Sequence, residues 1–168
     1  GSVVANEDGT VEAVMDGRTA RAVRTRDALV EATMSLIEEG DVRPTAPRIA
    51  ERAGVSVRSV FQHFDDLEGL FSALGDRAFA RLAEIVTPVD PSLPLTELLD
   101  RFVAERSRIN EMITPINRAA ILQAPTSSTI NRQFRHGHRL AAAHLAETFA
   151  PELVTLGSRA DELLDALV

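Results

Sequence analysis

A short segment from Ser56 to Phe64, with the sequence SVRSVFQHF, carries polar side chains that could form paired hydrogen bonds with a planar group such as the edge of a base. Ser56 is typical of a helix N-cap, because its hydroxyl can accept a hydrogen bond from the free N–H groups that open a helix. If Val60 and Phe64 face a core, Arg58 and Gln62 point outward one turn apart. Arginine and glutamine have the bidentate geometry that fits guanine and adenine edges in the DNA major groove. The outward residues of this predicted helix are Val57, Arg58, Ser59, Gln62 and His63.

A second short helix is predicted immediately before it. Thr45 stands at its N-cap, and Pro47 is tolerated in its first turn, where a missing N–H costs no hydrogen bond. Ile49 and Ala50 supply an apolar and a small residue where two helices could cross closely. Gly54 follows four positions later and permits the positive φ of a tight turn. This spacing predicts a helix-turn-helix.

The rest of the chain shows apolar residues at helical spacing and no credible strand, so we predict an all-α fold. Residues 1–19 are expected to form a disordered arm. Residues 20–66 are expected to form a three-helix helix-turn-helix domain, and residues 67–168 a helical body. The helices are predicted over 25–39, 45–53, 56–64, 65–86, 95–113, 114–124, 127–150 and 158–168, with a proline-containing linker at 88–94.

Composition excludes several classes of function. The 168 residues contain no cysteine, so a disulfide framework, a thiolate metal site and a cysteine nucleophile are excluded. No apolar run reaches the ~20 residues of a membrane span, and we expect a cytoplasmic protein without membrane contact. His136 and His138 lie two apart on a predicted helix and point to different faces, so we expect no metal. No nucleophile elbow or phosphate-binding glycine loop is present, so we expect neither enzymatic activity nor a cofactor.

The charge is unevenly distributed along the chain. The net charge is −7, yet residues 18–64 carry eight arginines against six acids. Arg18, Arg21, Arg24 and Arg26 stand together just before the first strongly periodic helix. A locally basic end on an acidic body is compatible with phosphate contact through one face. A solvated charged stretch is the alternative interpretation.

The motifs also resemble a known family. The segments RTRDALVEATMSLIEEG and PRIAERAGVSVRSVFQHFDDLEGLFSAL are similar to the N-terminal DNA-binding domain of TetR-type transcriptional regulators, over about residues 22–75. Two positions depart from that pattern: Phe61 replaces a usual tyrosine, and Leu67 a usual lysine. The candidate DNA-contacting residues are Arg24, Arg26, Thr45, Arg48, Ser56, Val57, Arg58, Ser59, Phe61, Gln62 and His63.

The resemblance implies a homodimer that binds a near-palindromic DNA operator as a repressor and is released by a small-molecule effector. It also implies that the dimer contacts lie on two C-terminal helices, so that the sequence stops inside the first of them. An apolar pocket with a few polar groups is expected in the body. Its candidate lining residues are Phe102, Arg106, Ile109, Met112, Asn117, Arg118, Ile121, Phe134 and His138.

Two other functions stay open from the sequence. The first is a helical protein-binding module that keeps the helix-turn-helix fold without DNA affinity, which the two departures and the acidic balance favour. The second is a small-molecule hydrolase, which no motif supports.

Overall fold

The structure is a computed structural model that describes residues 4–5, 11–12 and 17–167. The side chains of residues 4, 5, 11, 12, 158, 160, 163, 164 and 167 lie outside this description. Every packed element is a helix, which confirms the all-α prediction. The helices are α1 (Gly17–Glu38), α2 (Ala46–Ala53), α3 (Val57–His63), α4 (Leu67–Ile85), α5 (Leu95–Gln123), α6 (Ser128–Thr148), α7 (Ala150–Leu156), the 3-10 turn η1 (Gly157–Arg159) and α8 (Ala160–Leu167).

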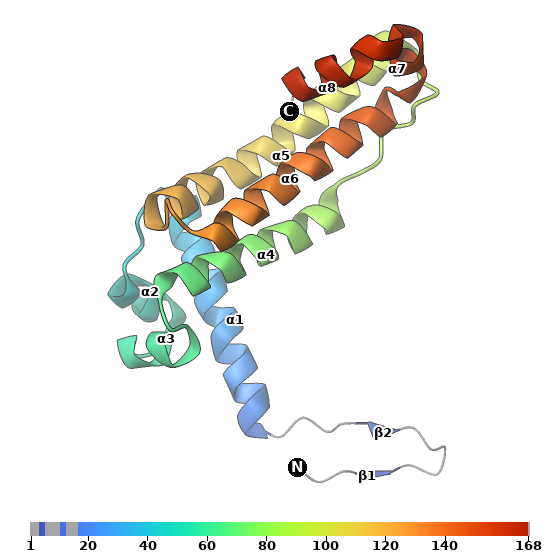
Figure 1. The fold of residues 1–168 in the computed structure, drawn as a ribbon. Coiled ribbons are helices and arrows are strands. Elements are labelled where there is room, and N and C mark those ends of the chain that lie inside the picture. The colour runs from blue at the N-terminus through green and yellow to red at the C-terminus, as the bar shows by residue number, and fades with distance from the viewer. Residues whose placement is uncertain (1–3, 6–10, 13–16, 168) are drawn as a thin grey trace.

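The molecule is elongated (Figure 1). Helices α1, α2 and α3 lie at one end, and the long helices α4, α5 and α6 run side by side towards the other, where α7 and α8 lie. Helix α1 contacts α2, α3, α4 and α5, so it joins the small N-terminal helices to the body. Helix α4 continues directly from α3 into the body and packs on α1, α5 and α6.

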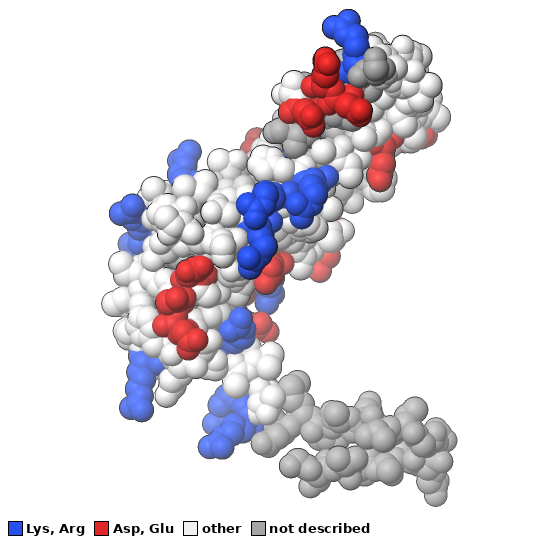
Figure 2. Space-filling view, viewed as in Figure 1, with Lys and Arg blue, Asp and Glu red and all other residues white. Residues whose placement is uncertain are grey.

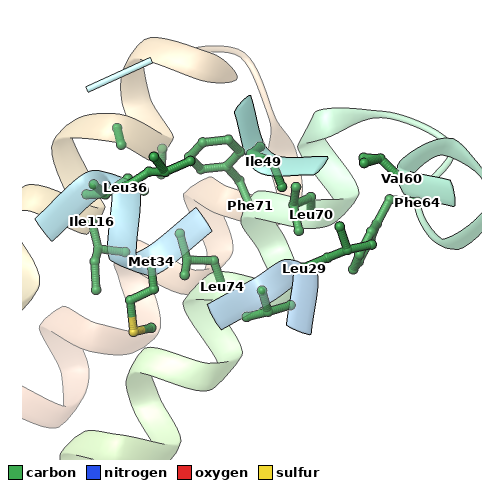
Figure 3. Close-up of a cluster of buried hydrophobic side chains, with 14 of the residues drawn as sticks. Leu29, Met34, Leu36, Ile49, Val60, Phe64, Leu70, Phe71, Leu74 and Ile116 are labelled. Carbon is green, nitrogen blue, oxygen red and sulfur yellow. The ribbon is translucent and has the colours of Figure 1, made fainter. Parts of the chain in front are cut away.

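Most of the buried apolar side chains form a continuous cluster that extends from α1 to α6 (Figure 3). Leu29 of α1, Ile49 of α2 and Val60 of α3 are fully buried in it. The same cluster includes Leu74 of α4 and Ile116 of α5. The apolar core therefore passes through the predicted domain boundary at residues 66–67 without interruption.

Helix α1 begins at Gly17 and not at Thr25, where the apolar period begins. The added turns carry arginine and alanine, which are good helix formers, but no apolar stripe that a periodicity argument could detect. Most of the arm predicted for residues 1–19 lies outside the described residues. The described residues of this arm include two strands that the sequence did not predict, β1 (Val4–Ala5) and β2 (Val11–Glu12), which pair antiparallel.

Helix α5 is a single helix where the sequence predicts two. Pro115, expected in the first turn of a second helix, lies inside it. A proline in a helix removes one hydrogen bond and usually kinks or ends the helix. Here Ile109 and Ile116 are both buried, seven residues apart, and Ala119 and Ala120 continue the same buried face. Packing on both sides of the proline thus favours a continuous helix over the predicted break.

The linker between α4 and α5 and the start of α6 agree with the prediction. The expected break at Pro151 is absent, because this residue lies in the first turn of α7, where a proline is well tolerated. Helix α6 also continues through Gly137. A Cβ there would lie 3.5 Å from the Phe79 ring of α4, which is an ordinary van der Waals distance.

Candidate nucleic-acid interface

The turn between α2 and α3 has the geometry that the sequence predicts. Gly54 has φ +72°, in the left-handed region that glycine adopts without steric cost. Its N–H donates to the Glu51 carbonyl at 3.1 Å, and the Val55 N–H donates to the Ala50 carbonyl at 3.0 Å. These two bonds end α2 and turn the chain directly into α3, so the two helices are held in a fixed relation.

Helix α3 is capped and anchored as expected. The Ser59 N–H donates to the Ser56 hydroxyl at 3.1 Å, which satisfies one of the free groups opening the helix. Val60 is fully buried and Phe64 nearly so, which fixes the inner face of α3. The outer face is open: Val57 is 40% exposed and Phe61 48% exposed. Arg58 and Gln62 are exposed as well, while Ser59 and His63 are half-buried.

The polar side chains on this outer face are open to an external partner. Within the described part of the chain, neither Arg58 nor Gln62 makes a side-chain hydrogen bond or ion pair with another residue. Thr45 occupies the N-cap position of α2, but its exposed hydroxyl makes no capping hydrogen bond. Three polar side chains around the α2–α3 unit therefore keep their hydrogen-bonding capacity for an external group.

Arg26 has a different environment. Its Nη1 donates to the carbonyl oxygen of His63 at 3.2 Å, and its guanidinium lies 4.2 Å from the centre of the Phe64 ring. A cation near a helix C-terminus interacts favourably with the exposed carbonyls there. Arg26 thus ties α1 to the end of α3. Arg24, two residues earlier, is exposed, and its side chain has no such bond within the described residues.

Helix α2 is held to the end of α1 by ion pairs. Arg52 donates to both carboxylate oxygens of Glu39, at 2.8 and 2.7 Å, and to the Ser35 hydroxyl at 2.6 Å. The Arg52 hydrogen bonds lower the pKa of the Glu39 carboxyl. Arg48, a candidate DNA contact, lies 3.0 Å from Asp41 and remains exposed. The pairs act mainly by orienting α2, since exposed ion pairs contribute little stability.

Residues 29–74 match the family model for "Bacterial regulatory proteins, tetR family". The match begins in α1 and ends in α4, so it contains the whole α2–α3 unit described above. The chain belongs to the TetR family.

A curated relative within the TetR family is the "HTH-type transcriptional repressor AcnR" of Corynebacterium diphtheriae. It is 30% identical over 118 residues, which cover 70% of this chain and 60% of AcnR. The chain therefore spans about 60% of the length of the curated relative it matches.

Across the residues that the structure describes, none of the helices combines the length and apolar character that a membrane crossing requires.

In this TetR-family chain, the candidate ligand residues of the body are spread over several environments. Ile109 is buried, and Phe102, Arg106, Met112, Asn117 and Phe134 are half-buried. Arg118, Ile121 and His138 are exposed. Two shallow hollows of about 430 and 360 Å³ lie at the α1–α2 junction, lined by residues that include Leu36 and Arg48. The pocket in the body stays a prediction.

His144 is a polar group in the body that no sequence pattern marks as a ligand contact. Its ring packs against Phe102 with the ring centres 5.2 Å apart, and Phe102 also contacts Phe149 edge to face at 5.1 Å. Burial, with the nearby Arg106 cation, lowers the pKa of His144, so the neutral imidazole is favoured. Its Nε2 is buried without a hydrogen-bond partner among the described residues. Only tertiary packing singles out this histidine; its local sequence, AAAHLAE, carries no motif.

Proposed function

We propose that this protein is a DNA-binding transcriptional regulator that acts as a repressor. The observation that carries the proposal is the outer face of α3, where Val57, Arg58, Phe61 and Gln62 are exposed on a helix anchored by Val60 and Phe64. Membership of the TetR family supports it, as does the relative named as an HTH-type transcriptional repressor.

In the proposed complex α3 lies in the major groove. Arg58 reads a guanine edge and Gln62 an adenine edge, each through paired hydrogen bonds. Val57 and Phe61 contact thymine methyl groups, since they are the exposed apolar residues of this face. The unpaired Thr45 hydroxyl at the start of α2 contacts a backbone phosphate, which sets the orientation of α3 without reading sequence.

We further propose that the protein acts as a homodimer on a near-palindromic operator. Two α3 helices about 34–36 Å apart would enter successive major grooves on one face of the duplex. Leu156, with an exposed side chain on α7, is a candidate interface residue. Leu163, Leu164 and Leu167 are further candidates, and their side chains lie outside the described residues. A single monomer species in sedimentation at micromolar concentration would contradict the dimer.

Release by a small-molecule effector is the third part of the proposal. A ligand site needs a mostly apolar wall with a few unpaired polar groups. The contact between Phe102 and His144, with its unpaired buried Nε2, supplies such a combination in the body. An effector that binds there would release DNA only if it bound the DNA-free conformation more tightly than the DNA-bound one.

The DNA-binding proposal is tested by selecting duplexes from a random-sequence pool and measuring affinity by fluorescence anisotropy. Arg58→Ala should weaken binding to the selected duplex by about 1–3 kcal/mol and leave binding to scrambled duplex nearly unchanged. Arg101→Ala is the matched control, because Arg101 is an exposed arginine of α5 paired only with Glu97 at 2.8 Å within the described chain. Failure to enrich any sequence would contradict the proposal.

A protein-binding module is the alternative, favoured by the apolar exposure of Val57 and Phe61 and by Asp65 and Asp66 directly after α3. In that case neither selected nor scrambled duplex would bind at physiological salt, and Arg58→Ala would change nothing in the DNA assay.

A further inference from the structure

The first two turns of α1 extend away from the rest of the molecule. No residue from Gly17 to Ala28 is buried, and the buried face of α1 begins only at Leu29. In Figure 1 this part of α1 continues past α2 and α3. An isolated helical extension without an apolar face gains nothing from packing, so its arginines are not there to support a core.

The charges on this extension are arranged against helix stability. Arg18, Arg21 and Arg24 follow one another at intervals of three residues, so neighbouring cations lie close together on the helix surface and repel each other. The first turn holds no acid, and cations near a helix N-terminus also interact unfavourably with the helix dipole. A sequence that breaks two local rules without a gain in packing points to a functional site.

The acids nearest to this stripe within α1 are already engaged. Asp27 lies 3.2 Å from Arg77 of α4, and Glu31 lies 3.1 Å from Arg77 and 2.7 Å from Arg81. Across residues 17–167, none of the described carboxylates forms an ion pair with Arg18, Arg21 or Arg24. Within residues 17–167, the stripe formed by these three arginines is therefore not neutralised by an ion pair, and basic side chains gather at this end of α1 in Figure 2.

We propose that the stripe of Arg18, Arg21 and Arg24 binds the phosphate backbone of duplex DNA outside the half-site that α3 reads. This inference rests on the proposed DNA-binding function. Duplex DNA is the occupant because the stripe belongs to the helix that holds α3: Arg26, two residues after Arg24, donates to the His63 carbonyl at the end of α3. DNA bound at α3 therefore places its flanking backbone beside the first turns of α1.

The reach of the extension sets the size of the effect. Residues 17–26 span ~15 Å of helix axis, which corresponds to about four base-pair steps of B-DNA. Each half-site should accordingly gain about four base pairs of protected backbone. The plot of log affinity against log salt has a negative slope. Neutralising three phosphates should make this slope steeper by about 2.7 for each protomer. A cation stripe of this kind adds affinity without base specificity.

The test uses the full chain and two versions of the selected duplex. One ends at the outer edges of the two half-sites, and the other continues for about six base pairs of arbitrary sequence on each side. Wild type should bind the longer duplex more tightly, and this advantage should disappear in the Arg18→Ala/Arg21→Ala/Arg24→Ala variant. When salt is raised from about 50 to 200 mM, affinity for the longer duplex falls by some factor. Per protomer, this factor should be about 40 times larger in wild type than in this variant.

The matched control removes three exposed arginines of α6, in Arg132→Ala/Arg135→Ala/Arg139→Ala, and should bind as wild type does. Thermal melting gives a second measurement, because removing mutually repelling cations should leave the melting temperature of the α1 variant unchanged or raise it. Equal binding of both duplexes by wild type, or an equal salt slope in the α1 variant, would overturn the inference. The proposed function would survive either result, whereas it fails if wild type binds no selected duplex.

Discussion

Arg26 and His63 are joined across the helix-turn-helix by a hydrogen bond of 3.2 Å from the guanidinium to the main-chain carbonyl. The same guanidinium lies over the ring of Phe64, the residue that ends α3. Arg26 therefore holds the end of the proposed recognition helix, in addition to the phosphate contact that the sequence predicts for it. The two roles differ in their dependence on salt.

If Arg26 acts by positioning α3, Arg26→Ala should weaken binding to the selected duplex with little change in the salt slope. It should also lower the free energy of unfolding by about 2 kcal/mol, the sum of the lower values for an exposed cation–π contact and one charged hydrogen bond. Salt titration of binding and urea denaturation measure the two effects. A drop of about one in the salt slope with unchanged stability would instead identify Arg26 as a phosphate contact.

Gly54→Ala should destabilise the protein by about 1–2 kcal/mol, because alanine must adopt φ +72° in the turn between α2 and α3. A Cβ there would meet no atom within 4 Å, so the cost is conformational and not steric. Gly54→Asn should cost less, since asparagine visits this region more readily. Urea denaturation of both variants gives the comparison, and equal losses for the two would contradict a purely conformational cost.

Gly75 and Gln133 should be energetically coupled. The Gln133 side-chain amide of α6 donates to the Ser72 carbonyl and to Asp76 Oδ1, both at 2.9 Å, and a Cβ on Gly75 would lie 2.6 Å from Gln133 Oε1. In a Gln133→Ala background, Gly75→Ala should stabilise α4 by about 1 kcal/mol through helix propensity. In wild type that gain should be cancelled, because the new methyl group displaces the amide. A double-mutant cycle in urea with zero coupling would contradict this contact.

His144 should make stability depend on pH between neutrality and mild acid. Its pKa is lowered from 6.5 in the folded protein, chiefly by burial, so below that value the unfolded chain takes up a proton more readily. Stability is therefore complete above about pH 6.5 and falls as the pH drops through this value. The carboxyls with lowered pKa, such as Glu39, lose their contribution only at more acidic pH.

The measurement is thermal melting at about pH 7.5 and pH 5.5. His144→Gln should flatten the difference between the two, whereas the control His138→Gln, at an exposed position of α6, should retain it. An identical pH dependence in wild type and His144→Gln would assign the effect to other groups.

The features that the sequence predicts well are those decided by a few neighbouring residues. The Ser56 cap and the left-handed Gly54 follow from the chemistry of single turns. Pro115 was misjudged for the opposite reason, since buried residues on both sides of it keep α5 continuous.

The contacts that escaped prediction join residues that are far apart in the sequence. The bond from Arg26 to His63 spans 37 positions, and that from Gln133 to Ser72 spans 61. Neither has a local signature. The start of α1 at Gly17 was missed because exposed arginine-rich turns carry no apolar period, and with it the extension that presents Arg18 and Arg21.

The uninterrupted core has a consequence for how the molecule opens. Because Leu29 and Val60 share a buried cluster with Ile116 and Ile130, the N-terminal helices have no separate interior that could melt while α5 and α6 stay folded. Amide hydrogens on the buried turns of α1 should therefore exchange with solvent at rates close to those in the middle of α5, as members of one cooperative unit. Any molecule that stabilises the body should slow hydrogen exchange in α1 by the same factor, even without touching it.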